Sequence, residues 1–141
     1  MTGSIRRAAA GDIAACAALY ERVGRGHFIW KPDTTFRAAD FAPIAAEEEV
    51  WLLERNGTLA AFLSYYVPAH FVHLLFIDEA HRRLRIGTRL LAHARDQYGV
   101  SHSLKVNEAN TAARAFYARL GYTAVERGET DGSAWIRLNS P

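Results

Sequence analysis

The sequence predicts an α/β domain in which helices are interleaved with the strands of a mixed sheet. Its 141 residues, half of them hydrophobic and 23% charged, are typical of one globular domain with a core of its own. Apolar residues recur at helical spacing in some segments and alternate or run continuously in others. Turn signals separate these segments into the order βααβββαβαββ, so residues 1–141 are expected to form a single domain.

The N-terminal third is predicted to contain one short strand and two helices. The strand covers residues 5–8, and the first helix covers 12–24, with glycines at its end. An aromatic-rich loop at 25–35 either covers the core or shapes a small-molecule pocket. A second helix is predicted over 36–46, and the three glutamates at 47–49 are expected to form a solvated connector.

Three strands are predicted in the middle of the chain. Residues 50–54 and 58–67 are expected to form a hairpin, because the Asn-Gly pair at 56–57 is the strongest short turn signal. The next strand is the apolar run 71–77, which only His73 interrupts. Such a continuous run predicts a strand that is buried on both faces.

The C-terminal part is predicted to add two helices and three strands. One helix covers 86–97 and is followed by a strand at 100–106. The other helix lies within 110–121, where an asparagine is a favourable N-cap and a glycine is a stop signal. The strands 122–127 and 134–138 close the domain as a pair.

Composition excludes several classes of protein. The net charge of +2, from 17 basic and 15 acidic residues, is too balanced for a nucleic-acid-binding protein. The single cysteine, Cys16, allows no intrachain disulfide and is predicted to be a buried apolar residue. We find neither an 18-residue apolar run nor a signal peptide, so a cytoplasmic location without membrane contact is expected. No metal site is predicted.

The basic loop at 81–88 joins the central strand to a helix. Five arginines and no acidic residue lie between Arg82 and Arg95. A helix N-terminus presents unpaired N–H groups and a partial positive charge, and Gly87 permits close approach of a ligand to the backbone. These features indicate a phosphate or pyrophosphate site, although a solvated basic surface has the same composition.

Two separated motifs occur in the C-terminal half of the chain. The first pattern, Gln/Arg-x-x-Gly-x-Gly/Ala, is matched by Arg82, Arg85 and Gly87, with Arg85 in place of the first glycine. The second, Asn-x-x-Ala-x-x-Phe-Tyr-x-x-x-Gly-Phe/Tyr, is complete as Asn110, Ala113, Phe116, Tyr117, Gly121 and Tyr122. Both resemble motifs of the GCN5-related N-acetyltransferase (GNAT) family. With the opening at 5–12 and the order of elements, the resemblance covers essentially the whole chain.

This resemblance implies a GNAT-like fold and acetyl-CoA as the cofactor. The fold would be a mixed, mostly antiparallel twisted sheet of about seven strands with four flanking helices, and its fourth and fifth strands would splay apart as a cofactor cleft. The residues that the resemblance assigns to cofactor binding are Leu75, Phe76, Ile77, Arg82, Arg83, Leu84, Arg85, Ile86, Gly87, Thr88, Asn110, Ala113 and Phe116. Arg85 would point either to solvent or to the 3′-phosphate of the adenosine.

The resemblance also places a general acid at Tyr117, which would protonate the departing thiolate; a core aromatic is the alternative. His73 is a candidate base, because an imidazole titrates near neutral pH. By a period of two it would share a face with Leu75 and Ile77, and its alternative is a structural histidine. The residues expected to border the acceptor are His27, Phe28, Trp30 and Tyr65.

The predicted function is therefore transfer of an acetyl group from acetyl-CoA to a primary amine of a small molecule or peptide, directly within a ternary complex. A non-catalytic acyl-CoA-binding regulatory module is the alternative, and the arginine at position 85 favours it. A nucleic-acid partner is not expected, because no aromatic residues are interleaved with the arginines of 82–95. A homodimer is compatible with the sequence.

Overall fold

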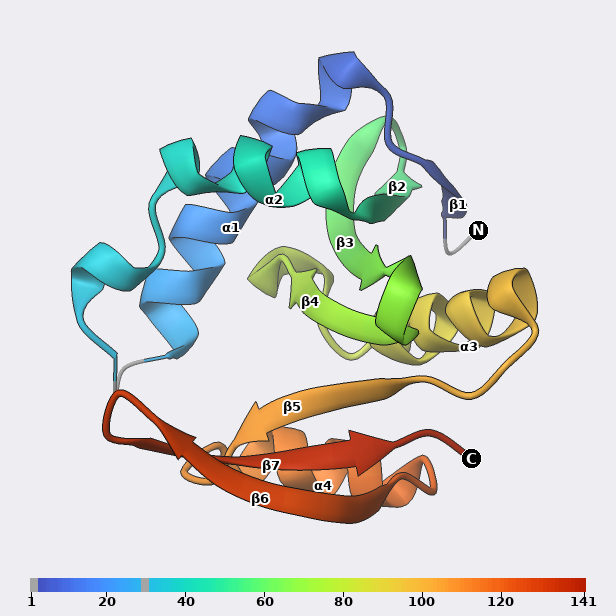
Figure 1. Cartoon of the computed structure of the whole chain (residues 1–141). Coiled ribbons are helices and arrows are strands. Elements are labelled where there is room, and N and C mark those ends of the chain that lie inside the picture. Colours follow the sequence, from blue (N-terminus) through green and yellow to red (C-terminus); the bar gives the residue numbers. More distant parts are fainter. Residues whose placement is uncertain (1–2, 29–30) are drawn as a thin grey trace.

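Seven strands form one sheet, and four helices lie on its two faces, in the computed structural model, which describes residues 3–28 and 31–141 (Figure 1). The strands are β1 (Ser4–Arg7), β2 (Glu49–Arg55), β3 (Thr58–Tyr66), β4 (Phe71–Ile77), β5 (Ser103–Asn107), β6 (Thr123–Thr130) and β7 (Ser133–Asn139). The helices are α1 (Ile13–His27), α2 (Phe41–Glu47), α3 (Ile86–Tyr98) and α4 (Thr111–Arg119). The strand order is β1-β2-β3-β4-β5-β7-β6, which confirms the predicted mixed, mostly antiparallel sheet.

The sheet divides between β4 and β5, which are the only adjacent strands that run parallel among the described residues. These strands pair only at Phe71–Ser103 and Val72–Leu104, near the start of each. Beyond Val72 the two strands diverge, and Figure 1 shows the resulting separation between the β1–β4 half and the β5-β7-β6 half. The predicted splay of the fourth and fifth strands is confirmed.

The helices cover the two faces of the sheet with separate cores. Helices α1 and α2 contact β2, β3 and β4 on one side, which we call the α1/α2 face. Buried side chains of this face include Cys16, Leu19, Phe41, Leu52, Phe62, Leu74 and Phe76. Helices α3 and α4 cover the other side, the α3/α4 face, whose core includes Leu53, Leu63, Val72, Leu90, Leu104, Tyr117 and Ile136. No described helix is long and apolar enough to span a membrane.

His73 forms a β-bulge in β4. The register between β3 and β4 shifts at this point and leaves His73 without a partner on β3. One extra residue changes the alternation of side chains, so Val72 lies in the α3/α4 core while Leu74 lies in the α1/α2 core. His73 points to the α1/α2 face, where its Nδ1 lies 2.7 Å from Oε2 of Glu48.

The bulge corrects two predictions about the central strand. His73 does not share a face with Leu75 and Ile77, which belong to the α3/α4 side. The strand is also not buried on both faces, because the His73 side chain is 40% exposed and Leu75 and Ile77 are only half-buried. A period of two fails here because it assumes an unbroken ladder of strand pairs.

Several element boundaries differ from the prediction for local physical reasons. Helix α1 continues past Gly24, where an added side chain would lie 2.3 Å from the Phe36 ring, so this glycine serves packing and not helix termination. The second predicted helix is shortened to α2, preceded by two 3₁₀ turns. Pro43 is tolerated because it lies in the first turn of α2, where its missing N–H has no intrahelical acceptor. Strand β5 begins at Ser103, three residues later than predicted.

Candidate active site

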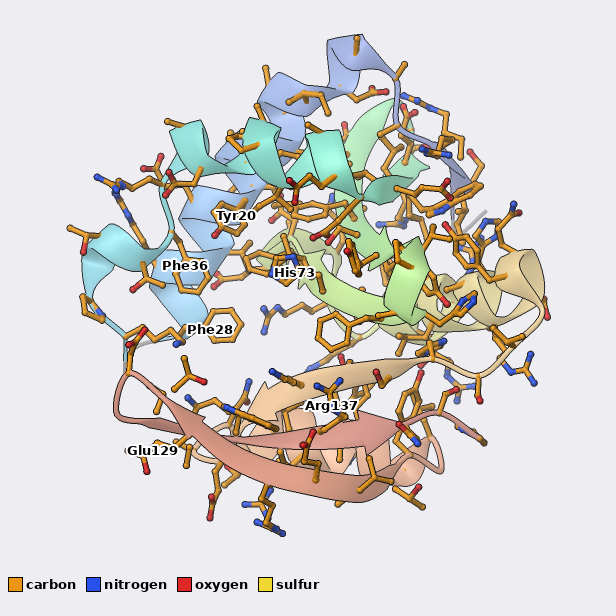
Figure 2. All side chains as sticks on the ribbon, viewed as in Figure 1. Tyr20, Phe28, Phe36, His73, Glu129 and Arg137 are labelled. Carbon is orange, nitrogen blue, oxygen red and sulfur yellow. The ribbon has the colours of Figure 1, made fainter. Side chains whose placement is uncertain are left out.

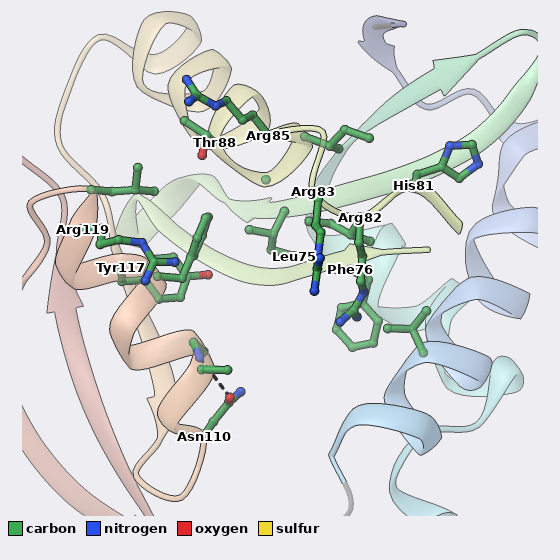
Figure 3. A pocket seen from close by; sticks show the side chains of 18 of the residues that line it. Leu75, Phe76, His81, Arg82, Arg83, Arg85, Thr88, Asn110, Tyr117 and Arg119 are labelled. Atoms are coloured by element: carbon green, nitrogen blue, oxygen red, sulfur yellow. Dashed lines mark hydrogen bonds between the residues drawn. The ribbon is translucent and has the colours of Figure 1, made fainter. Parts of the chain in front are cut away.

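A cavity of about 1010 Å³ opens where β4 and β5 separate (Figure 3). It lies between the end of β4, the basic loop, the start of α3 and the helix α4, and Val23 and Phe28 border it from the side of α1. The predicted cofactor residues that line it are Leu75, Phe76, Ile77, Arg82, Arg83, Arg85, Ile86, Gly87, Thr88, Asn110, Ala113 and Phe116. Residues that the sequence did not single out also line it, namely Val23, His81, Ala112, Arg119 and Leu120.

The backbone of the basic loop adopts a conformation suited to anions. Arg83 and Arg85 have positive φ values of 66° and 58°, and α3 begins directly after Arg85. Left-handed residues before a helix turn successive backbone N–H groups toward one concave surface, which binds anions. The left-handed region favours glycine, which explains why the motif carries glycine at the position of Arg85. A non-glycine residue there costs roughly 1–2 kcal/mol.

Gly87 provides close packing at the floor of the cavity. A Cβ atom at this position would lie 3.1 Å from Cδ1 of Ile77 and 3.3 Å from Cζ of Phe116. The glycine therefore lets the first turn of α3 approach both the end of β4 and the helix α4. This close approach places the first N–H groups of α3 beside the open edge of β4, so one ligand can contact both.

The edge of β4 that faces the gap carries unpaired backbone groups. The amide of Asp78 donates to the carbonyl of Ala60 at 2.8 Å, and the amide of Leu74 donates to Oγ of Ser64 at 3.1 Å. Successive amides of a strand point to opposite sides, so those of Leu75 and Ile77 point away from β3 and toward the gap. An extended ligand in the gap would therefore find the hydrogen-bonding edge of a strand.

Tyr117 lies in α4 with its ring buried and its hydroxyl at the cavity (Figure 3). The rings of Phe116 and Tyr122 pack against it, with centroids 5.0 and 5.2 Å away. Burial raises the pKa of Tyr117 above its ordinary value, and the Tyr122 phenol adds to this effect. The side chain of Asn110 caps α4 by accepting from the amide of Ala113 at 3.1 Å, which fixes the helix and its tyrosine.

His73 occupies a different part of the site from Tyr117. It does not line the cavity but lies on the α1/α2 face, immediately after the last β4–β5 pair. Its partner Glu48 has a side chain only 10% exposed, so the expected solvated connector at 47–49 is wrong for this residue. The sequence does not reveal the buried position of Glu48, because nothing in a run of three glutamates indicates that one of them turns inward beside a bulge.

Two further predicted site residues lie elsewhere. Tyr65 is fully buried and stacks on Tyr98, with ring centroids 3.8 Å apart, and its hydroxyl lies 3.0 Å from Nδ1 of His70. The prediction that it borders the acceptor is therefore wrong. Leu84 packs against the α3/α4 core and does not line the cavity.

The predicted acceptor loop is only partly described. Phe28 lines the cavity and stacks on Phe36, with centroids 5.0 Å apart. Trp30 lies outside the described residues, as does the side chain of His27. Phe28 therefore borders both the cavity and the α1/α2 core.

Comparisons with known proteins agree with this geometry. The model of the acetyltransferase (GNAT) family matches residues 16–122. The solution structure of YjaB from Escherichia coli has a TM-score of 0.83 and 22% identity, covering 99% of this chain and 98% of that one. The PaiA N-acetyltransferase from Thermoplasma acidophilum, in complex with coenzyme A, has a TM-score of 0.80 and 15% identity over 100% of both chains. The ribosomal-protein-alanine N-acetyltransferase from Brucella melitensis has a TM-score of 0.73 and 20% identity, covering 97% and 98%. A search of curated proteins gave no match.

Proposed function

The chain belongs to the acetyltransferase (GNAT) family, and on this premise we propose that it is an acetyl-CoA-dependent N-acetyltransferase. The acetyl group would pass directly to a primary amine of a small molecule or peptide within a ternary complex. One observation carries the proposal: the gap between β4 and β5 joins an unpaired strand edge, an anion-binding helix start and a buried phenol in one cavity. These are the three features that binding and cleavage of an acyl-CoA thioester require.

The described residues fit coenzyme A in shape and charge. The backbone amides from Arg83 to Thr88 would hold the pyrophosphate, with the guanidinium groups of the loop beside it. The pantetheine arm, which carries amides, would pair with the edge of Leu75 and Ile77. Bound acetyl-CoA supplies an acetyl group that is activated as a thioester. The cavity of about 1010 Å³ is at the upper end of the range for small-molecule sites, as a ligand of this length needs.

Tyr117 would act as the general acid. A phenol whose pKa is raised by burial stays protonated throughout the neutral range and can donate a hydrogen bond or a proton. The thiolate that departs from the thioester needs this proton. Tyr117 lies between Phe116 and Tyr122 on a capped helix, so its hydroxyl is held toward the cavity without reorganisation.

His73 would accept the proton of the attacking amine from the opposite face. An ionised carboxylate only accepts hydrogen bonds, so Glu48 fixes the tautomer of neutral His73 that carries its proton on Nδ1. Nε2 then carries the lone pair that can take a proton, directly or through water. The acid and the base would thus act from different sides of the gap, since Tyr117 lines the cavity and His73 lies on the α1/α2 face.

Release of coenzyme A thiol tests the proposal. Purified protein is mixed with acetyl-CoA and a panel of amines, amino acids and peptides, and the free thiol is measured with and without each acceptor. Acceptor-dependent release supports the enzyme. Tight binding of acetyl-CoA by calorimetry, without release for any acceptor, would instead favour a non-catalytic acyl-CoA-binding module.

A further inference from the structure

Charged and aromatic side chains from both halves of the sheet meet on the α1/α2 face, at the point where β4 and β5 separate. Figure 2 shows His73 on one side of the separation and Arg137 on the other. The ring of Phe71 connects them: the guanidinium carbon of Arg137 is 5.6 Å from its centroid, and the His73 ring is 6.4 Å from it. Arg137 also donates to Oγ of Ser103, which belongs to the last β4–β5 pairs.

The β4 side of this location has an excess of hydrogen-bond acceptors. Glu48 uses Oε2 for His73, while its buried Oε1 has no partner among the described residues. Because Oε1 is buried, a ligand cannot donate to it directly, but a carboxylate with an unsatisfied oxygen favours a ligand that brings N–H groups to the imidazole beside it. The His73 side chain is 40% exposed and the Glu48 side chain only 10% exposed, so such a ligand would reach the imidazole first.

The β5-β7 side has an excess of positive charge. Lys105 and Arg137 lie directly opposite one another in the register of β5 and β7, on the same face. Like charges directly opposite destabilise a sheet. One carboxylate, Glu126, lies 2.7 Å from Nε of Arg137 and is 55% exposed, so one acidic group faces two cations. The Lys105 ammonium lies 4.1 Å from the centre of the Trp135 ring, which holds it on this face.

We propose that the acceptor is an amine that also carries an anionic group, with the amine directed to His73 and the anion to Arg137 and Lys105. This inference rests on the proposed acetyltransferase function and names the substrate class of the same site. An amino carboxylate or an amino phosphate has the required charges. A polyamine or a lysine-rich peptide would bring positive charge to a surface that already carries an excess of it.

The test compares acceptors that differ only in the anion. 4-Aminobutanoate and butylamine have amines of similar basicity, and 2-aminoethyl phosphate and ethylamine form a second pair that separates phosphate from carboxylate. We expect kcat/KM for at least one anionic acceptor to exceed that of its neutral partner by about tenfold or more, the ratio that corresponds to one charged contact. Equal rates within both pairs, or faster acetylation of the neutral amines, would overturn the inference.

Variants then locate the anion. Arg137→Gln is expected to reduce the preference for the anionic acceptor about tenfold, and Arg137→Lys is expected to retain part of it. Arg127→Gln is a matched control, because Arg127 belongs to the same strand pair but lies opposite Ile136 and so on the α3/α4 side. If Arg127→Gln reduced the preference for the anionic acceptor as much as Arg137→Gln does, the preference would be a general charge effect, and the proposed position of the anion would be refuted.

The outcomes separate this inference from the proposed function. Thiol release with neutral amines alone overturns the inference and supports the acetyltransferase. Absence of release with every amine, including the anionic ones, overturns both. Calorimetric titration with coenzyme A confirms in each variant that the fold and the cavity are intact.

Discussion

Replacement of Tyr117 by phenylalanine removes one hydroxyl from a buried ring and leaves its packing in place. Because the ring contacts of Phe116 and Tyr122 remain, the free energy of unfolding should change by no more than about 1 kcal/mol. Loss of a positioned general acid typically costs about 10²–10⁴ in rate. At 1.36 kcal/mol for each factor of ten, this corresponds to roughly 3–5 kcal/mol of activation free energy.

The loss should appear in kcat and not in the affinity for acetyl-CoA, because the hydroxyl would act on the departing thiolate. Thiol release under saturating acetyl-CoA measures kcat, and calorimetry measures the affinity. Tyr122→Phe is the matched control: the ring lies 5.2 Å away, but its hydroxyl bonds to Nε2 of His102 at 2.6 Å and does not line the cavity. If Tyr117→Phe kept more than half of the activity, Tyr117 would be a core aromatic and the proton would reach the thiolate from water.

Four further predictions address the basic loop, the base, acid stability and the open face of the sheet. Arg85→Gly should leave the affinity for coenzyme A within about tenfold by calorimetry and raise the free energy of unfolding by up to about 1 kcal/mol, because the residue has φ of 58°; a hundredfold loss of affinity would make Arg85 an essential ligand. His73→Gln should flatten the acidic limb of the pH–rate profile, and an unchanged limb would exclude His73 as the base. Burial lowers the pKa of His102 to about 4 in the folded protein, below the value of about 6.5 expected in the unfolded chain. As the pH decreases from about 6.5 to about 4, the unfolded chain therefore binds the proton first, and the free energy of unfolding should fall by up to about 3 kcal/mol. Denaturant titrations of His102→Gln should lack this slope. Gly128→Val should lower the free energy of unfolding by about 1–3 kcal/mol and alter tryptophan fluorescence, since a Cβ there would lie 2.2 Å from Trp135; an unchanged spectrum would contradict the packing.

Some residues of the site could be identified from the sequence because they lie close together in it. Asn110 caps the helix that contains Ala113 and Tyr117. Helical spacing alone therefore predicts which residue caps this helix and which residues face inward. The strand, basic loop and helix start at 71–91 are likewise consecutive, and residues from all three line the cavity. These features depend on local backbone geometry, which the order of residue types determines.

Other residues became visible only in the folded chain. His73 was assigned to the wrong face because a bulge arises from pairing between strands and leaves no mark in the alternation of one strand. Nothing in the sequence marks Glu48 or Arg137 as a site residue, because Glu48 belongs to a run of three glutamates and Arg137 is one polar residue of a predicted strand. They come to the same face of the sheet because its order places β5 beside β4 and β7 beside β5, although β7 is distant from β4 in the chain.

The sequence by itself therefore determined the kinds of element, their order and the residues within each motif. Hydrophobic periodicity, caps and turn signals act over a few residues, so one sequence is enough to read them. Only the tertiary structure decided where β4 and β5 stop pairing, which face His73 takes and which charges meet across the gap. Those properties depend on contacts between segments far apart in the chain, whose register and side are established only when the sheet assembles.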